Sequence, residues 1–281
     1  QQFAVNAPAS HISQKSFSID PPQKLYSYFF RLLPILKPEK AGISSRYVEK
    51  FIRTLNRRGL PMHSVLLMKG NDIFAEYYWK PFHKDFCHRM YSQTKSYVSV
   101  AIGLLLEDGK LDINTKIADI FPEKIDGELR GYMSELTVEY LLKMETCGVD
   151  GIPFWITDKD PDRTHLYFNK NEGTVPPDMR WYYDSCGSQL LCTIVEKVSG
   201  KSLFDFLNER IFKHLDAFKT ATVLKTQNDD SWGDSALVCT PRDMAAFARF
   251  VMNWGEWNGK RLMNAEYLKK ATSRIVDNNM T

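Results

Sequence analysis

The chain has 281 residues, of which 43% are hydrophobic and 25% are charged, and its formal net charge at pH 7 is +3. This is the composition of a globular protein with a large core, and the scattered basic residues give no reason to expect nucleic acid as a partner. The cysteines lack a CxxC pair and the histidines lack HExxH spacing, so no metal site is expected. We find no apolar run of membrane-spanning length.

The predicted elements begin after an N-terminal arm and helix, assigned to residues 1–44. A helix is expected over about 45–58, because apolar residues recur there on one face. Two β-prone runs, 64–69 and 73–78, flank a Gly-Asn-Asp turn and predict an antiparallel β-hairpin.

The period of the apolar residues then becomes helical after Ser92, and Gly109 predicts where that helix ends. Residues 110–235 are expected to form a mainly helical subdomain, which includes an apolar helix that ends at Gly200. The sheet-and-helix scaffold is assigned to residues 45–109 and 236–281. Its second part holds a helix from about 241 and a weak strand candidate at 260–263. A two-stranded hairpin alone is not a stable sheet, so the strands that we predict are too few to complete one.

The run Ser92-Gln93-Thr94-Lys95 is the first candidate for chemistry. Residues three apart on a helix share a face, so the Lys95 amine can reach the Ser92 hydroxyl. A serine is a poor nucleophile until a base takes its proton, and a lysine is such a base only when burial or neighbouring cations lower its pKa. The pattern by itself equally fits Ser92 as a helix N-cap.

A Tyr-x-Ser pattern at Tyr183-Asp184-Ser185 is the second candidate, because a tyrosine beside a Lys–Ser pair can pass a proton to a leaving group. The pattern also fits Tyr97, Tyr132 and Tyr167, the last followed by Asn169. Position favours Tyr183, which precedes an apolar helix, although it could also be a packing aromatic. Trp155, Trp181, Tyr182 and Trp232 could line an apolar cleft or pack in the core.

Several further segments, taken in chain order with these two, carry a family resemblance. They are 92–96, 107–111, 121–123, 136–144, 181–191, 198–203, 240–244 and 255–260. Among them, Leu136-Thr137-Val138-Glu139-Tyr140-Leu141-Leu142-Lys143-Met144 is similar to a Thr-Val-x-x-Leu-Leu-x-Met signature. Together they resemble the penicillin-recognising serine hydrolases, which include class C β-lactamases, D-alanyl-D-alanine carboxypeptidases, related esterases and 6-aminohexanoate-dimer hydrolases.

This resemblance implies an α+β fold, in which helices flank an antiparallel sheet and a mainly helical subdomain faces the catalytic cleft. Ser92 would be the acylated nucleophile, Lys95 its base and Tyr183 the proton shuttle. Ser185 and Trp181 would contact the substrate. No metal or organic cofactor is implied.

Two departures from the family pattern stand out. Ser185 replaces the Asn of many members, which removes an amide donor–acceptor pair and speaks against typical β-lactam recognition. The family also has a third motif, Lys or His, a small residue and Gly, on a strand after the segment 255–260. We find no such strand before Thr281, so we expect the C-terminal strands to be absent from this chain. The chain would then be a fragment or be completed by a separate C-terminal chain.

Two functions follow from these observations. The first is a serine hydrolase, an esterase, amidase or carboxypeptidase, that cleaves a small-molecule amide or ester through an acyl-enzyme. The second is a catalytically weak β-lactamase-like binding or interaction protein that lacks the third motif. The sequence opens with Gln1-Gln2-Phe3, without a Met, and favours neither a cytoplasmic nor an exported protein.

Overall fold

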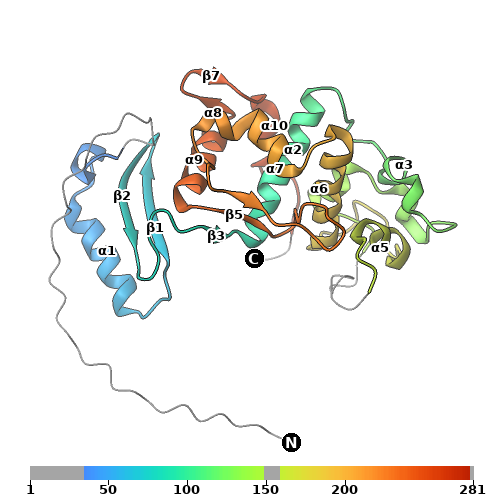
Figure 1. Cartoon of the computed structure of the whole chain (residues 1–281), viewed down its shortest axis with the longest axis horizontal. Helices are drawn as coiled ribbons and strands as arrows, with labels where there is room; N and C mark the ends of the chain where they lie inside the picture. Colours follow the sequence, from blue (N-terminus) through green and yellow to red (C-terminus); the bar gives the residue numbers. More distant parts are fainter. Residues whose placement is uncertain (1–34, 149–158, 279–281) are drawn as a thin grey trace, which may run out of the picture. The chain divides into compact units, whose positions relative to one another are not determined.

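A computed structural model describes residues 35–148 and 159–278 of the chain (Figure 1). The N-terminal arm and most of the helix expected before residue 44 lie outside these ranges. At the beginning of the described chain, Ile35 forms an isolated β-bridge with Ile73. A 3-10 turn, Pro38–Ala41, follows.

The predicted hairpin and the helix before it are both confirmed. Helix α1 (Ser45–Arg57) begins after Ser44, whose hydroxyl accepts a hydrogen bond from the backbone N–H of Arg46. Strands β1 (Ser64–Lys69) and β2 (Asp72–Tyr78) pair antiparallel. The turn between them needs a left-handed residue, which Gly70 supplies with a φ of 57°.

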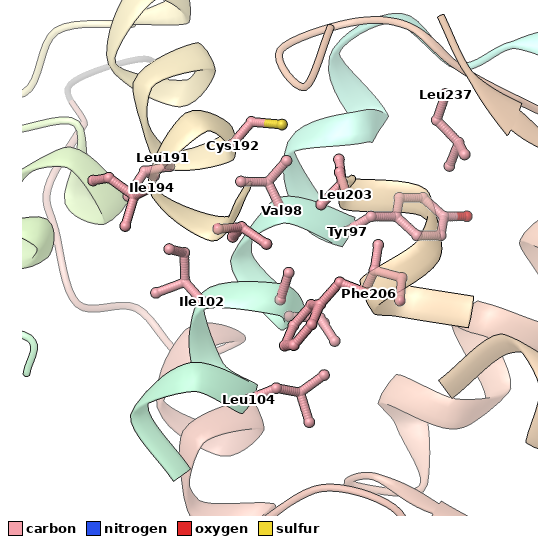
Figure 2. Close-up of a cluster of buried hydrophobic side chains, with 14 of the residues drawn as sticks. Tyr97, Val98, Ile102, Leu104, Leu191, Cys192, Ile194, Leu203, Phe206 and Leu237 are labelled. Atoms are coloured by element: carbon pink, nitrogen blue, oxygen red, sulfur yellow. The ribbon is translucent and has the colours of Figure 1, made fainter. Parts of the chain in front are cut away.

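Helices α2 (Thr94–Glu107) and α6 (Ser185–Ser199) pack side by side in the core (Figure 1). Helix α2 is apolar on nearly all sides, as expected of a helix that is surrounded by protein. Figure 2 shows Val98 of α2 and Cys192 of α6 within this buried cluster. Gly109 and Gly200, both in left-handed conformation, follow the two helices as predicted.

The described chain between residues 110 and 235 is mainly helical. Its helices are α3 (Ile117–Ile120), α4 (Val138–Lys143), α5 (Arg163–Lys170), α6, α7 (Leu203–Leu207) and α8 (Lys213–Leu215). One short strand, β4 (Thr222–Val223), lies at its end. None of the helices in the described part of the chain has the length and apolarity needed to cross a lipid bilayer. The assignment of 110–235 to a separate subdomain stays a prediction.

A small antiparallel sheet, in the order β3-β5-β4, joins distant parts of the sequence. Strand β3 (His88–Arg89) pairs with β5 (Leu237–Cys239), which also pairs with β4. The sheet therefore places the residues just before Ser92 beside the residues just after 235. The predicted α+β class is confirmed, and its sheets are short and antiparallel.

The C-terminal part of the described chain begins with α9 (Pro241–Met252). Thr240 and Asp243 form a reciprocal capping box at its N-terminus. Strands β6 (Glu256–Trp257) and β7 (Lys260–Arg261) pair across a turn, and α10 (Ala265–Ala271) follows. The weak strand expected at 260–263 thus forms a ladder with β6 and does not extend the β1–β2 hairpin.

Candidate active site

Ser92 and Lys95 lie together at the start of α2. Ser92 is exposed on a 3-10 turn, Tyr91–Gln93, which leads directly into the helix, and Lys95 is half-buried in its first turn. The Lys95 Nζ donates to Ser92 Oγ at 3.2 Å and to the backbone oxygen of Asp234 at 2.7 Å. The amine therefore has two neighbours: a hydroxyl three residues away and a carbonyl from a distant segment.

Tyr91, the residue before Ser92, has an unusual backbone. Its φ is 45°, in the left-handed region that a bulky residue rarely adopts, and its side chain is 64% exposed. Met90, just before it, is fixed because its N–H donates to the backbone oxygen of Leu237 at 2.8 Å. Backbone strain of this kind gathers at functional sites, where the surrounding structure maintains it.

Tyr183, which lies just before α6, faces Lys95. Its ring centre lies 5.3 Å from Lys95 Nζ, and its side chain is 47% exposed. Trp181 contacts it edge to face, with 6.3 Å between the ring centres. Ser185 is half-buried at the first position of α6, and no hydrogen bond joins it to Ser92 or Lys95 within the described residues.

Asp184 fixes the start of α6 next to Tyr183. Its buried carboxylate accepts from the Gly187 N–H at 2.7 Å, the Tyr167 hydroxyl at 3.0 Å and the Thr146 hydroxyl at 3.2 Å. Burial raises the pKa of Asp184, and the three donors offset part of this rise. The cap thereby holds Tyr183 at a rigid helix terminus.

The other tyrosines that match the sequence pattern lie elsewhere. Tyr97 is fully buried and stacks on Phe247, with 3.8 Å between the ring centres. Tyr167 is also buried, and its hydroxyl donates to the Asp184 carboxylate. Tyr132 lies in a 3-10 turn, Gly131–Glu135. Among these candidates, a contact with Lys95 is recorded for Tyr183 alone, within the described residues.

The segment 231–237 is a part of the site that the sequence did not reveal. It supplies the Asp234 oxygen to Lys95, and the N–H of Leu237 donates to the Thr94 hydroxyl at 3.2 Å. A backbone carbonyl has no residue-type signature, so no sequence pattern could have identified this contact.

Trp232, from the same segment, lies between two guanidinium groups. Arg89 and Arg163 approach its ring to 4.5 Å and 4.4 Å. Trp232 thus stacks with these arginines. Trp155, another aromatic from the sequence analysis, lies outside the described residues. The described chain groups no three His, Cys, Asp and Glu side chains in a way that could hold a metal ion.

A groove of about 500 Å³ runs beside the site. Lys95 and Gln93 line it together with side chains of α2, α9 and α10, most of them apolar, among them Val100, Phe247 and Leu268. Lys95, the hydrogen-bond partner of Ser92, therefore borders a hollow with largely apolar walls.

Comparisons with known proteins identify the family of the chain. The family described as Beta-lactamase matches residues 48–281. A 6-aminohexanoate-dimer hydrolase of Paenarthrobacter ureafaciens is 25% identical over 217 residues, which cover 73% of this chain and 55% of that enzyme. The chain thus spans little more than half the length of that relative.

Solved structures share the fold at low sequence identity. A penicillin binding protein from Bacillus halodurans has a TM-score of 0.63 at 19% identity, over 80% of this chain and 78% of that one. An octameric penicillin-binding protein homologue from Pyrococcus abyssi has a TM-score of 0.60 at 20% identity, over 81% of this chain and 60% of that one.

Proposed function

Because the chain belongs to the beta-lactamase family, we propose that it is a serine hydrolase that cleaves an amide or ester bond, with Ser92 as the nucleophile. One observation carries the proposal. The Lys95 amine lies 3.2 Å from Ser92 Oγ and is held there by a second bond to the Asp234 carbonyl. A nucleophile within hydrogen-bond reach of an oriented base is the minimum that acyl transfer requires.

The reaction divides into two steps. In the first, Lys95 acts as the base and takes the proton of Ser92, whose oxygen attacks the substrate carbonyl carbon and forms a tetrahedral intermediate. The oxyanion is stabilised by backbone N–H groups, among them that of Ser92 at the start of its turn. Collapse of this intermediate breaks the amide or ester bond, and Tyr183 delivers a proton to the leaving group.

Water completes the cycle in the second step. It adds to the acyl carbon and loses a proton to the Lys95–Tyr183 pair. The bond between the acyl carbon and Ser92 Oγ then breaks, the pair returns the proton to Ser92 Oγ, and a free acid leaves. The protein groups carry protons between these steps and are unchanged at the end.

The expected substrate is a small amide or ester. The relative from Paenarthrobacter ureafaciens is named as a hydrolase of 6-aminohexanoate dimer, and a linear amide of that kind fits a site bordered by a largely apolar groove. Exposed Tyr91 and Tyr183, with Trp181 behind the latter, provide aromatic surface next to Ser92. We assign substrate contact to Trp181 and Ser185 within this proposal.

Labelling with a fluorophosphonate probe tests the proposal on the full chain. We expect one covalent adduct on the peptide that contains Ser92, and none in the Ser92→Ala variant. Ser96→Ala is the matched control, because Ser96 is an exposed serine one turn further along α2. Absence of an adduct on the folded wild-type chain, or an adduct that survives Ser92→Ala, contradicts the proposal.

A further inference from the structure

We propose that Gln189 is a positioning residue for the active-site lysine and acts through the segment 231–235; this inference rests on the proposed function. Gln189 lies in α6, is 2% exposed and, in the described part of the chain, forms no hydrogen bond with Ser92 or Lys95. Its effect on the site passes through backbone groups. Arg89 anchors the same segment at its other end.

The Gln189 amide binds the segment at two points. Its Nε2 donates to the backbone oxygen of Ser231 at 2.9 Å, and its Oε1 accepts from the N–H of Gly233 at 2.9 Å. One rigid, buried amide therefore fixes two backbone groups two residues apart. Few side chains other than an amide can donate and accept at once in this way.

Packing prevents the segment from moving toward the helices. A Cβ atom at Gly233 would overlap Cys192 of α6 and would lie 3.3 Å from Val98 of α2. The N–H of Ser231 also donates to the Glu196 carboxylate at 3.1 Å. The segment is thus wedged between the two helices that carry Tyr183 and Ser92 at their starts.

Arg89 secures the residue after Asp234. Its Nε donates to the backbone oxygen of Ser235 at 3.0 Å, and its Nη2 reaches the Ser235 hydroxyl at 3.1 Å. The Asp234 carbonyl therefore lies between two anchored residues, Gly233 and Ser235. Since a lysine side chain has many rotamers, the direction of the Lys95 amine depends on this fixed acceptor at 2.7 Å.

The test measures the rate of fluorophosphonate labelling against pH in folded wild-type and Gln189→Leu chains. The leucine keeps a similar volume but removes both bonds of the Gln189 amide, to the Ser231 oxygen and from the Gly233 N–H. We expect labelling to slow by about 10- to 100-fold and its pH profile to shift, because the base is no longer held in place. A defect in folding alone would lower the melting temperature and leave the pH profile of the folded fraction unchanged.

Thr193→Val is the matched control on the same helix. Among the described residues, Thr193 Oγ1 bonds the backbone oxygen of Gln189 alone, at 3.3 Å, so this variant loses a hydrogen bond without affecting the segment 231–235. Its labelling rate and pH profile should equal those of the wild type.

Arg89→Lys provides a second arm if Gln189→Leu does not fold. It keeps the positive charge and loses the two-point contact with Ser235, and we expect the same slowing and the same kind of pH shift. Wild-type rate and profile in a folded Gln189→Leu chain, or in Arg89→Lys, overturn this inference alone. Absence of Ser92-dependent labelling in the wild type overturns the proposed function as well.

Discussion

Arg242 of α9 and Glu76 of β2 form a two-point ion pair across 166 residues of sequence, with Nε–Oε1 and Nη2–Oε2 distances of 2.8 Å. The Glu76 side chain is 11% exposed and that of Arg242 is 25% exposed. The Tyr78 hydroxyl also donates to Glu76. The pair thus joins the hairpin to the helix that follows the active-site segment.

Loss of this pair should destabilise the protein. Arg242→Ala leaves Glu76 largely buried without its cation, and we expect about 2 kcal/mol less free energy of unfolding. Urea unfolding measures the change. Arg53→Ala is the control, because the Arg53–Glu49 pair is exposed and should contribute about 0.5 kcal/mol or less. Equal losses in the two variants would contradict the assignment.

Tyr183→Phe should slow the hydrolysis of substrates with poor leaving groups more than that of substrates with good ones. The variant keeps the ring beside Lys95 and removes the hydroxyl, so hydrolysis of an amide substrate should fall by about 100- to 10,000-fold. A p-nitrophenyl ester, whose leaving group needs little protonation, should lose far less. Steady-state kinetics on the two substrates make the comparison, with Tyr182→Phe as the neighbouring control. Equal losses on amide and ester would rule out proton delivery to the leaving group.

Asp184→Ala should weaken the start of α6. It removes the helix cap and strands the buried Tyr167 and Thr146 hydroxyls, for a loss of about 3 kcal/mol in unfolding free energy. Ser202→Ala removes the exposed cap of α7 and should lose only about 1 kcal/mol. Chemical denaturation measures both losses. A loss for Asp184→Ala no larger than that for Ser202→Ala would contradict a stabilising role of the bonds from Tyr167 and Thr146.

His165 should make stability depend on pH. Burial by itself lowers the pKa of His165, but hydrogen bonds to Asp126 and Asp160, at 2.8 Å and 2.6 Å, outweigh it and leave this pKa raised. A raised folded-state pKa adds stability that is complete below the ordinary value of about 6.5 and is lost as pH rises through the folded-state pKa.

The comparison is with His165→Gln. The excess in unfolding free energy of the wild type over this variant should be larger at about pH 6 than at about pH 9. His214→Gln is the control, since burial and two lysines lower the pKa of His214 and the trend with pH should be the opposite. If the difference in unfolding free energy between the wild type and His165→Gln grew toward alkaline pH, this account would be refuted.

Much of the fold could be predicted from local sequence, because its main helices carry their own signals. Gly109 and Gly200 follow α2 and α6, and Thr240 caps α9. Strands β3, β4 and β5 were not found, since each spans only two or three residues and is too short to show a period. Their pairing depends on contacts between distant residues, which a single sequence does not display.

The candidate site likewise combines residues that local sequence predicts with residues that only the tertiary structure identifies. Ser92 and Lys95 are three residues apart, so helical spacing alone predicts their contact, and Tyr183 was favoured by its position before α6. Asp234 and Gln189 were missed, because one acts through a backbone carbonyl and the other through bonds to backbone groups. Their roles depend on contacts between distant segments, which a single sequence does not display.

The 3.2 Å contact between Ser92 and Lys95 is local, whereas the 2.7 Å contact between Lys95 and the Asp234 carbonyl closes a loop of 139 residues. A covalent probe that reads the reactivity of Ser92 therefore also reads whether this long loop is closed. If the segment 231–235 detached while α2 stayed folded, Lys95 would lose this acceptor, and we expect Ser92 to react more slowly. Under the proposed function, the reactivity of Ser92 thus reports local unfolding elsewhere in the chain.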